Sequence, residues 1–378
     1  MISLAIAMGV GRFAFTPLFP LMVRDGLLNS EAGALLAASN YLGYLVGALV
    51  AARIRVKSAT LLALGLISTV IVTAAVGWTS SVSHWAVLRF AAGVMSAWTL
   101  VATSAWGLGW LGSVGRPHLA GAMFAGVGLG IAAAGMFCLV VAGPGVTALE
   151  MWVELAILAS IAALFPLVVS HKLSVPTAAT GTSVPQTSPR NLPANARGLI
   201  VCYALFGFGY ILPATYLPAL ARGLVDDPKV FGWAWPLFGM AAALSTVVVS
   251  WALQRSNRLS VWAASHVLMA IGVLLPAVFA SLISVAIAAL LVGGTFMVIT
   301  MLAMQEARAL AEGDATVVLG QMTAGFAFGQ LMGPVASAAI GLYTADYATA
   351  LNYALGLSAT GLLLSAFYLW REVRRRQF

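Results

Sequence analysis

The sequence predicts an all-α integral membrane protein in which twelve transmembrane helices form two similar six-helix halves. Three observations predict this fold. Of the 378 residues, 61% are hydrophobic and only 8% are charged, whereas soluble domains carry about 25% charged residues. Apolar runs of about 20 residues, enough to cross a hydrocarbon core of about 30 Å as a helix, recur along the chain. In two cases, the sequence of one run aligns with that of the run six places later in the chain.

The apolar runs define twelve spans and one interruption. The spans cover 1–23, 31–52, 58–78, 84–110, 119–143, 150–170, 198–221, 229–253, 259–279, 282–304, 316–341 and 346–370. The first begins at Met1 itself, which leaves open whether Met1 is the true start. Between spans 6 and 7, residues 171–197 hold four prolines among Ser, Thr, Ala and Gln, a composition typical of a flexible linker. We therefore expect an N-terminal half at 1–170 and a C-terminal half with a basic tail at 198–378.

Internal repeats support this division. Spans 5 and 11 align at an offset of 199, where Gly126 and Gly130 match Gly325 and Gly329. Spans 1 and 7 align at an offset of 198, which places Tyr210 opposite Arg12. Parallel repeats of this kind are related by an axis along the membrane normal and place a binding site between them. The small residues spaced by four in spans 5 and 11 favour close helix packing, which serves either static packing or a surface that slides during transport.

The distribution of Lys and Arg predicts the orientation. Fourteen of the 19 lie in segments on one side of the predicted membrane and three on the other, which leaves Arg12 and Arg89 within spans. By the positive-inside rule, both termini of this multi-pass protein are cytoplasmic, and we expect it in the cytoplasmic membrane. A basic tail of this kind contacts anionic lipid, so the net charge of +8 does not indicate a nucleic-acid partner.

Arg12 occupies the most informative stretch, GVGRFAFTPLFP at residues 9–20. It lies about 16 Å along a helix counted from Met1, close to the middle of the hydrocarbon layer. A guanidinium at that depth costs at least about 2.5 kcal/mol, and it stays protonated. We therefore expect Arg12 to face a watery cavity lined by protein, with glycines and prolines beside it that let the helix bend.

Acidic residues leave the centre of the predicted bundle empty, because they fall at span ends, with Glu154 one turn into span 6 as the marginal case. Arg12 and Arg89 without a buried carboxylate attract anions, and we predict that they bind a small organic anion, Arg12 in a forked geometry. The alternative is that each arginine caps backbone carbonyls exposed by nearby Gly and Pro.

Three segments resemble the major facilitator superfamily, and the likeness covers essentially the whole chain. Residues 47–55, GALVAARIR, are similar to the loop G-x-L-a-D-R-x-G-R after span 2, with Ala51 at the acidic position. Residues 89–93, RFAAG, resemble the segment R-x-x-q-G of span 4. Residues 9–17, GVGRFAFTP, resemble the opening signature of the YbfB/YjiJ-like branch.

The resemblance implies a major facilitator fold and alternating access. It implies a proton-coupling role for Arg89 and gating by the loops after spans 2 and 8, which carry Arg53, Arg55, Arg255 and Arg258. Glu154 is a second candidate for proton coupling because of its position one turn into span 6. The resemblance also places spans 1, 2, 7, 8 and 11 around the cavity. Candidate substrate-binding residues in these spans and span 4 are Arg12, Phe13, Phe15, Asn40, Tyr44, Arg89, Tyr203, Tyr210, Trp233 and Gln330.

We therefore predict a secondary active transporter for a small organic solute, with the lipid bilayer as its surroundings, and we expect a monomer. Export of hydrophobic or drug-like compounds with protons is one alternative, and a non-transporting membrane sensor with the same fold is another. We expect no enzyme activity, because no intramembrane nucleophile stands beside a base. No phosphate-binding G-x-x-x-x-G-K-S/T loop occurs, and the histidines and the two cysteines lack metal-ligand spacing. We accordingly expect no cofactor and no metal.

Overall fold

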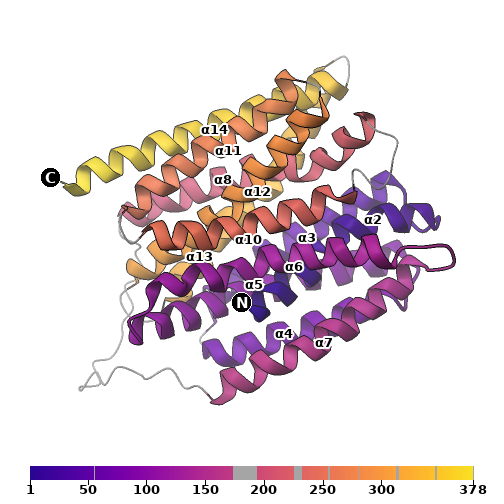
Figure 1. Ribbon diagram of the computed structural model, residues 1–378, viewed down its shortest axis with the longest axis horizontal. Coiled ribbons are helices and arrows are strands. Elements are labelled where there is room, and N and C mark those ends of the chain that lie inside the picture. Colours follow the sequence, from indigo (N-terminus) through magenta and orange to yellow (C-terminus); the bar gives the residue numbers. More distant parts are fainter. Residues whose placement is uncertain are drawn as a thin grey trace.

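A computed structural model describes residues 1–54, 56–172, 194–224, 232–253, 256–279, 281–311, 315–344 and 347–377. Every regular element in these ranges is a helix, as predicted (Figure 1). The first half contains α1 (Ile2–Leu4), η1 (Ala5–Phe13), α2 (Phe15–Arg24), α3 (Ser30–Ala51), α4 (Ser58–Val76), α5 (Val82–Ser113), η2 (Pro117–Leu119), α6 (Ala120–Val141) and α7 (Ala148–Lys172). The second contains α8 (Ala194–Leu224), α10 (Ala234–Ala252), α11 (Arg258–Val278), α12 (Leu282–Ala309), α13 (Thr316–Gly341) and α14 (Tyr347–Gln377).

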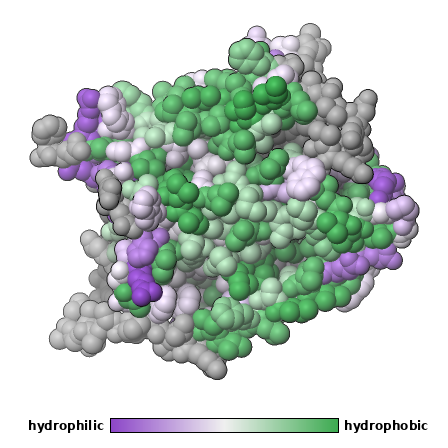
Figure 2. Space-filling model, viewed as in Figure 1, coloured by the Kyte–Doolittle hydropathy of each residue, from purple (hydrophilic) through white to green (hydrophobic). Residues whose placement is uncertain are grey.

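The outer surface of the bundle matches a membrane environment. Figure 2 shows hydrophobic residues across the middle of the molecule and hydrophilic ones gathered at its two ends. Among the described residues, eleven helices are long and apolar enough to cross a membrane. The predicted eleventh span, α13, is not one of them, because its 26 residues include two glutamines and five glycines.

Basic residues of the predicted inner segments lie together at one end of the bundle. The C terminus lies at this end in Figure 1, and the last turn of α14 carries Arg374, Arg375 and Arg376. The ends of α5 and α12 and the start of α11 lie there too. We call it the basic end. The predicted linker lies for the most part outside the described residues, so the boundaries of the two halves stay a prediction.

The first predicted span is not one regular helix. A nine-residue π-helix, η1, separates the single turn α1 from α2. In a π-helix each backbone hydrogen bond spans one residue more than in an α-helix. Such segments are rare, and those that occur are frequently at functional sites. Arg12 is the residue before the last in this π-helix, so the widened segment carries the intramembrane cation.

Glycines in α6 allow the first helix to approach its backbone. A Cβ atom at Gly130 would lie 2.8 Å from the Cα of Ala5, and one at Gly126 would lie 2.9 Å from the Cα of Met1. No side chain fits at such distances without a shift of backbone. The stripe of small residues predicted in span 5 therefore packs within the first half rather than on a surface between the halves.

The second half repeats these contacts. Gly325 of α13 faces Ile200 of α8, and a Cβ at Gly329 would overlap the carbonyl of Ala204. Each of these residues lies 199 positions after its counterpart in the first half. Contacts between whole helices thus recur at the offset found in the sequence, as expected for two pseudo-symmetric six-helix bundles.

A second set of glycines forms the seam between the halves, where α6 packs along α10. A Cβ at Gly128 would lie 2.5 Å from the backbone nitrogen of Ala243, and one at Gly135 would lie 2.8 Å from Cδ of Pro236. Gly121 meets Ser250 in the same way. These three glycines are spaced by seven, so they share the face of α6 that the sequence analysis did not single out.

We expect Gly130→Ala to destabilise the protein, because the added methyl group overlaps the backbone of Ala5. Overpacking of this kind costs about 1–3 kcal/mol. Gly356→Ala in α14 is the matched control, since no atom lies within 4 Å of its added Cβ and alanine favours a helix over glycine. Thermal unfolding of both purified variants measures the difference. Equal melting temperatures would contradict close packing between η1 and α6.

Candidate functional site

Arg89 of α5 supports the backbone of the π-helix. Its side chain is 4% exposed, and it donates from Nη1 to the carbonyl of Gly11 at 3.1 Å and from Nη2 to the carbonyl of Arg12 at 3.0 Å. Pro17, five residues after Arg12, has no N–H to donate to the Arg12 carbonyl in the π pattern. The ring of Phe15 lies 4.7 Å from the Arg89 guanidinium. Arg89 thus takes the carbonyl-capping role considered above.

Arg12 reaches the second half of the protein instead. Its side chain is 3% exposed, and its Nη2 donates to the side-chain oxygen of Gln330 in α13. Nε and Nη1 have no hydrogen-bond partner among the described residues. The ring of Tyr44 lies 3.7 Å from the guanidinium carbon and that of Phe13 lies 5.5 Å away, which stabilises the charge through cation–π contacts.

Gln330 connects Arg12 to Tyr210. The Gln330 side-chain nitrogen donates to the Tyr210 hydroxyl oxygen at 2.7 Å, so the two ends of the amide are oriented by different partners. Because the Tyr210 oxygen accepts this bond, its own proton remains available to another acceptor. The sequence alignment had placed Tyr210 opposite Arg12, and the structure joins the two through one amide.

Aromatic rings from both halves surround this network. Phe296 of α12 stacks on Tyr210 with ring centroids 4.7 Å apart and meets Phe13 edge-on at 5.9 Å. Phe326 of α13 stacks on Tyr210 at 5.5 Å and meets Tyr44 edge-on at 6.2 Å. We call these rings the aromatic cluster. Its members are Phe13, Tyr44, Tyr203, Phe206, Tyr210, Trp235, Phe238, Phe296 and Phe326.

Two predicted site residues lie beside the cluster rather than in it. Asn40 is fully buried, and its Nδ2 donates to the carbonyl of Arg89 at 3.0 Å, which ties α3 to α5 within the first half. Phe15 packs on Arg89 and on Phe19. Both side chains therefore contact Arg89, which in turn supports the segment that carries Arg12.

Two other predicted residues lie at the surface. Trp233 precedes α10 and is 48% exposed, whereas Trp235, two residues later, is 7% exposed and stacks on Phe238. Glu154 is exposed on α7. The sequence analysis missed Trp235, Phe206, Phe238, Phe296 and Phe326, because aromatic residues are common throughout an apolar helix and their spacing alone does not distinguish an inner from an outer face.

Two of the four predicted gating residues, Arg53 and Arg258, lie within the described residues. Arg53 is exposed and donates to the carbonyl of Leu49 in its own helix at 3.2 Å. Arg258 pairs with the buried Glu306 of α12 at 2.8 Å, and Arg376 pairs with the same carboxylate at 3.1 Å. Arg55 and Arg255 lie outside the described residues. The Glu306 network therefore joins three helices of the second half to one another.

Contacts between the halves at the basic end come from residues that the sequence analysis did not select. The hydroxyl oxygen of Ser250 in α10 accepts from the N–H of Gly121 at 3.1 Å and donates to the carbonyl of His118 at 2.6 Å. Arg308 of α12 donates to the carbonyl of Ala105 in α5 at 3.2 Å. Side chains of the second half thus satisfy backbone groups of the first.

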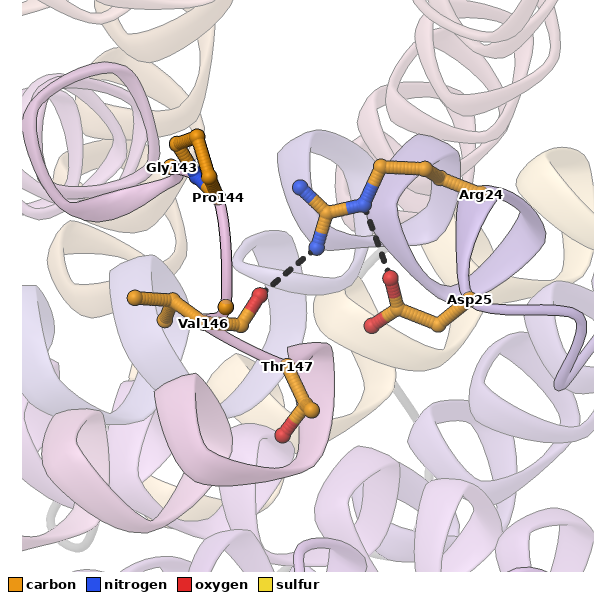
Figure 3. Close-up of a pocket in the computed structure, with 7 residues that line it drawn as sticks. Arg24, Asp25, Gly143, Pro144, Val146 and Thr147 are labelled. Carbon is orange, nitrogen blue, oxygen red and sulfur yellow. Dashed lines mark hydrogen bonds and ion pairs between the residues drawn. The ribbon is translucent and has the colours of Figure 1, made fainter.

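A separate surface pocket lies at the opposite end of the first half (Figure 3). Arg24 donates to Asp25 and to the carbonyl of Val146, both at 2.7 Å, and Asp25 accepts from the N–H of Ala148 at 2.6 Å. Partial burial raises the pKa of Asp25, but the hydrogen bonds from Arg24 and Ala148 outweigh it and leave that pKa below its usual value. These bonds tie the end of α2 to the start of α7, a structural role.

Sequence and structure comparisons agree on one family. Residues 4–369 match the family model described as "Uncharacterised MFS-type transporter YbfB". The chain belongs to this family. It is therefore a membrane transporter of the major facilitator superfamily (MFS) with a multi-pass fold, and not an enzyme. A comparison with curated proteins found no match.

Solved MFS structures share the fold of this chain. The human organic anion transporter MFSD10 (TETRAN) is similar with a TM-score of 0.71, and FucP in the outward conformation with a TM-score of 0.72. Each is 14% identical, and each alignment covers 97% of both chains. The TM-scores support a common fold. Identity this low does not identify the cargo, which is argued below from the site. No group of three or more potential metal ligands occurs among the described residues.

We expect substitutions of the two intramembrane arginines of this MFS transporter to change its stability in different directions. Arg89→Met leaves the carbonyls of Gly11 and Arg12 without their donors, at a cost of about 1–3 kcal/mol for each buried group. Arg12→Met removes a buried cation for which the described residues provide no acidic partner, so the ligand-free protein keeps or gains stability.

Thermal unfolding of the ligand-free proteins measures both effects, with Arg371→Met, an exposed arginine of α14, as the control. We expect the melting temperature to fall for Arg89→Met and to match or exceed that of the wild type for Arg12→Met. A larger loss in Arg12→Met than in Arg89→Met would identify the Arg12 guanidinium as a structural group.

Proposed function

We propose that the protein is a secondary active transporter that moves a small organic anion across the cytoplasmic membrane by alternating access. The observation that carries the proposal is the environment of Arg12. This guanidinium is buried between the two halves, it contacts both through Gln330 and Tyr44, and two of its nitrogens have no partner among the described residues.

The energetics favour an anionic ligand over packing alone. An intramembrane arginine costs at least about 2.5 kcal/mol, and leaving buried donors unpaired adds about 1–3 kcal/mol for each group. A carboxylate of the substrate would supply the missing acceptors and the missing negative charge together, in hydrogen bonds about twice as strong as neutral ones. A binding partner for this site therefore comes from outside the described residues, and we propose that it is the substrate.

Alternating access is supported by the way the halves meet. Gly128 and Gly135 of α6 bring its backbone against Ala243 and Pro236 of α10, and we propose that this contact and the hydrogen bonds of Ser250 and Arg308 at the basic end break and re-form during transport. We propose that this end is cytoplasmic and closed in the structure. One of the similar structures is FucP in the outward conformation.

We expect Arg12→Ala and Arg12→Lys to abolish or strongly reduce transport, because alanine removes the charge and lysine removes the planar fork. The measurement is uptake of radiolabelled organic acids into proteoliposomes that contain equal amounts of purified wild type, both variants and the control Arg371→Ala. Unchanged uptake in both Arg12 variants would remove Arg12 from the mechanism. Binding without flux in sealed vesicles would instead identify a sensor.

Coupling to protons does not require a carboxylate of the protein. Glu154 is exposed on α7, and Arg89 is bonded to two carbonyls of the π-helix. We propose that any proton is exchanged by the carboxyl group of the substrate itself, which binds Arg12 as the carboxylate. Transport would then respond to a proton gradient through the share of the substrate that is ionised on each side of the membrane.

We accordingly expect Glu154→Gln to keep the full response of transport to an imposed proton gradient. The same proteoliposomes provide the test, with inside-acid, inside-alkaline and symmetric buffers compared for wild type and variant. A response that disappears in Glu154→Gln, while uptake under symmetric buffer persists, would assign proton coupling to Glu154 and contradict the proposal.

A further inference from the structure

We infer that the ligand of the Arg12 site carries a single negative charge on a flat, aromatic body. The inference rests on the proposed function and narrows it from organic anions in general to aromatic monoanions. It follows from two independent features of the site: the number of positive charges available to a ligand, and the kind of surface beside the available one.

Arg12 is the intramembrane guanidinium that keeps more donors for a ligand. Nη1 and Nη2 of Arg89 each donate to a backbone carbonyl of the π-helix and leave only its Nε without a partner among the described residues, whereas both Nε and Nη1 of Arg12 have none there. Within the described spans no Lys lies near the site, and the buried His266 accepts a hydrogen bond from the indole of Trp262 at 3.1 Å, so that nitrogen carries no proton. A second anionic group on the ligand would stay buried and unpaired, which costs several kcal/mol.

A neutral ligand is disfavoured for the converse reason. It would supply acceptors to Nε and Nη1 but would leave the charge of Arg12 uncompensated in apolar surroundings. The Tyr210 hydroxyl keeps its own proton free, because its oxygen accepts from Gln330. The site thus offers a cation and a nearby hydroxyl donor, a pair that fits one carboxylate.

Flat rings form the surface next to the guanidinium. Tyr44 and Phe13 of the first half contact Arg12 directly. Phe296 and Phe326 of the second half continue the same surface through ring contacts with Phe13 and Tyr44. Aromatic pairs attract each other beyond the burial of their area, so a planar ligand gains more here than a puckered or branched ligand of the same size.

Both halves contribute to this surface, which gives the planar body a mechanical role. Phe13 meets Phe296 and Tyr44 meets Phe326 directly in this structure, so a planar ligand enters between them only in a state in which the halves have moved apart, and it then contacts both halves at once. Since a ligand shifts a conformational equilibrium only by its differential affinity for the states, a ligand that joins the two ring surfaces favours the states in which both surfaces contact it. A small aliphatic acid would bind Arg12 and lack this second effect.

The test compares matched probes on the purified full-length protein at pH 7.5, by thermal shift and by competition with the transported acid in proteoliposomes. Benzoate is the aromatic monoanion, benzamide its neutral analogue, terephthalate its dianion and cyclohexanecarboxylate its puckered monoanion. We expect benzoate to bind at least tenfold more tightly than benzamide and terephthalate, and several-fold more tightly than cyclohexanecarboxylate. Arg12→Gln should remove the preference for benzoate over benzamide, and Arg371→Gln should keep it.

Each outcome separates this inference from the proposed function. Equal binding of terephthalate and benzoate, with loss of both in Arg12→Gln, would overturn the single-charge inference and leave transport of an organic anion standing. Equal binding of cyclohexanecarboxylate and benzoate would overturn the aromatic part. Failure of all four probes to bind the wild type, beside Arg12-dependent uptake of another anion, would overturn the inference alone. The wild-type comparisons hold even if Arg12→Gln does not fold.

Discussion

The positive charge of Arg12, buried where the two halves meet, is the constraint on which the rest of the structure depends. The guanidinium cannot lose its proton, and the chain gives it one amide oxygen and two ring faces in place of a carboxylate. Because Gln330 and Tyr44 belong to different halves, the charge also links the halves to each other. Any movement between them changes the surroundings of this group.

Several unusual local features exist to place that charge. The π-helix around Arg12 requires glycines at its contact with α6, where a Cβ at Gly130 would meet the backbone of Ala5. It also requires a donor for the Arg12 carbonyl, because Pro17 has no N–H, and Arg89 donates to this carbonyl and to that of Gly11. The two arginines are therefore not equivalent: Arg89 commits two of its three nitrogens to the segment that carries Arg12, whereas Arg12 keeps two nitrogens without a partner among the described residues.

The glycines of α6 likewise form two groups with different contacts, which the spacing of small residues in the sequence does not distinguish. Gly126 and Gly130 pack within the first half, and Gly121, Gly128 and Gly135 face α10 across the seam. We propose that this glycine-lined contact separates and closes again during transport. Hydrogen bonds from Ser250 and Arg308 to backbone groups of the first half hold this seam at the basic end.

The sequence by itself determined the class of the protein, the helical fold and the internal repeat, because the bilayer imposes a length and a polarity on every span. It also predicted a binding role for Arg12, which stays a prediction. It also indicated Tyr210 through the repeat. Only the tertiary structure decided which residues meet Arg12: Trp235 and not Trp233 lies inside, Glu154 faces outward, and Phe296 and Phe326 join the site. In lipid both faces of a helix are apolar, so hydropathy marks the span and packing alone selects its inner face.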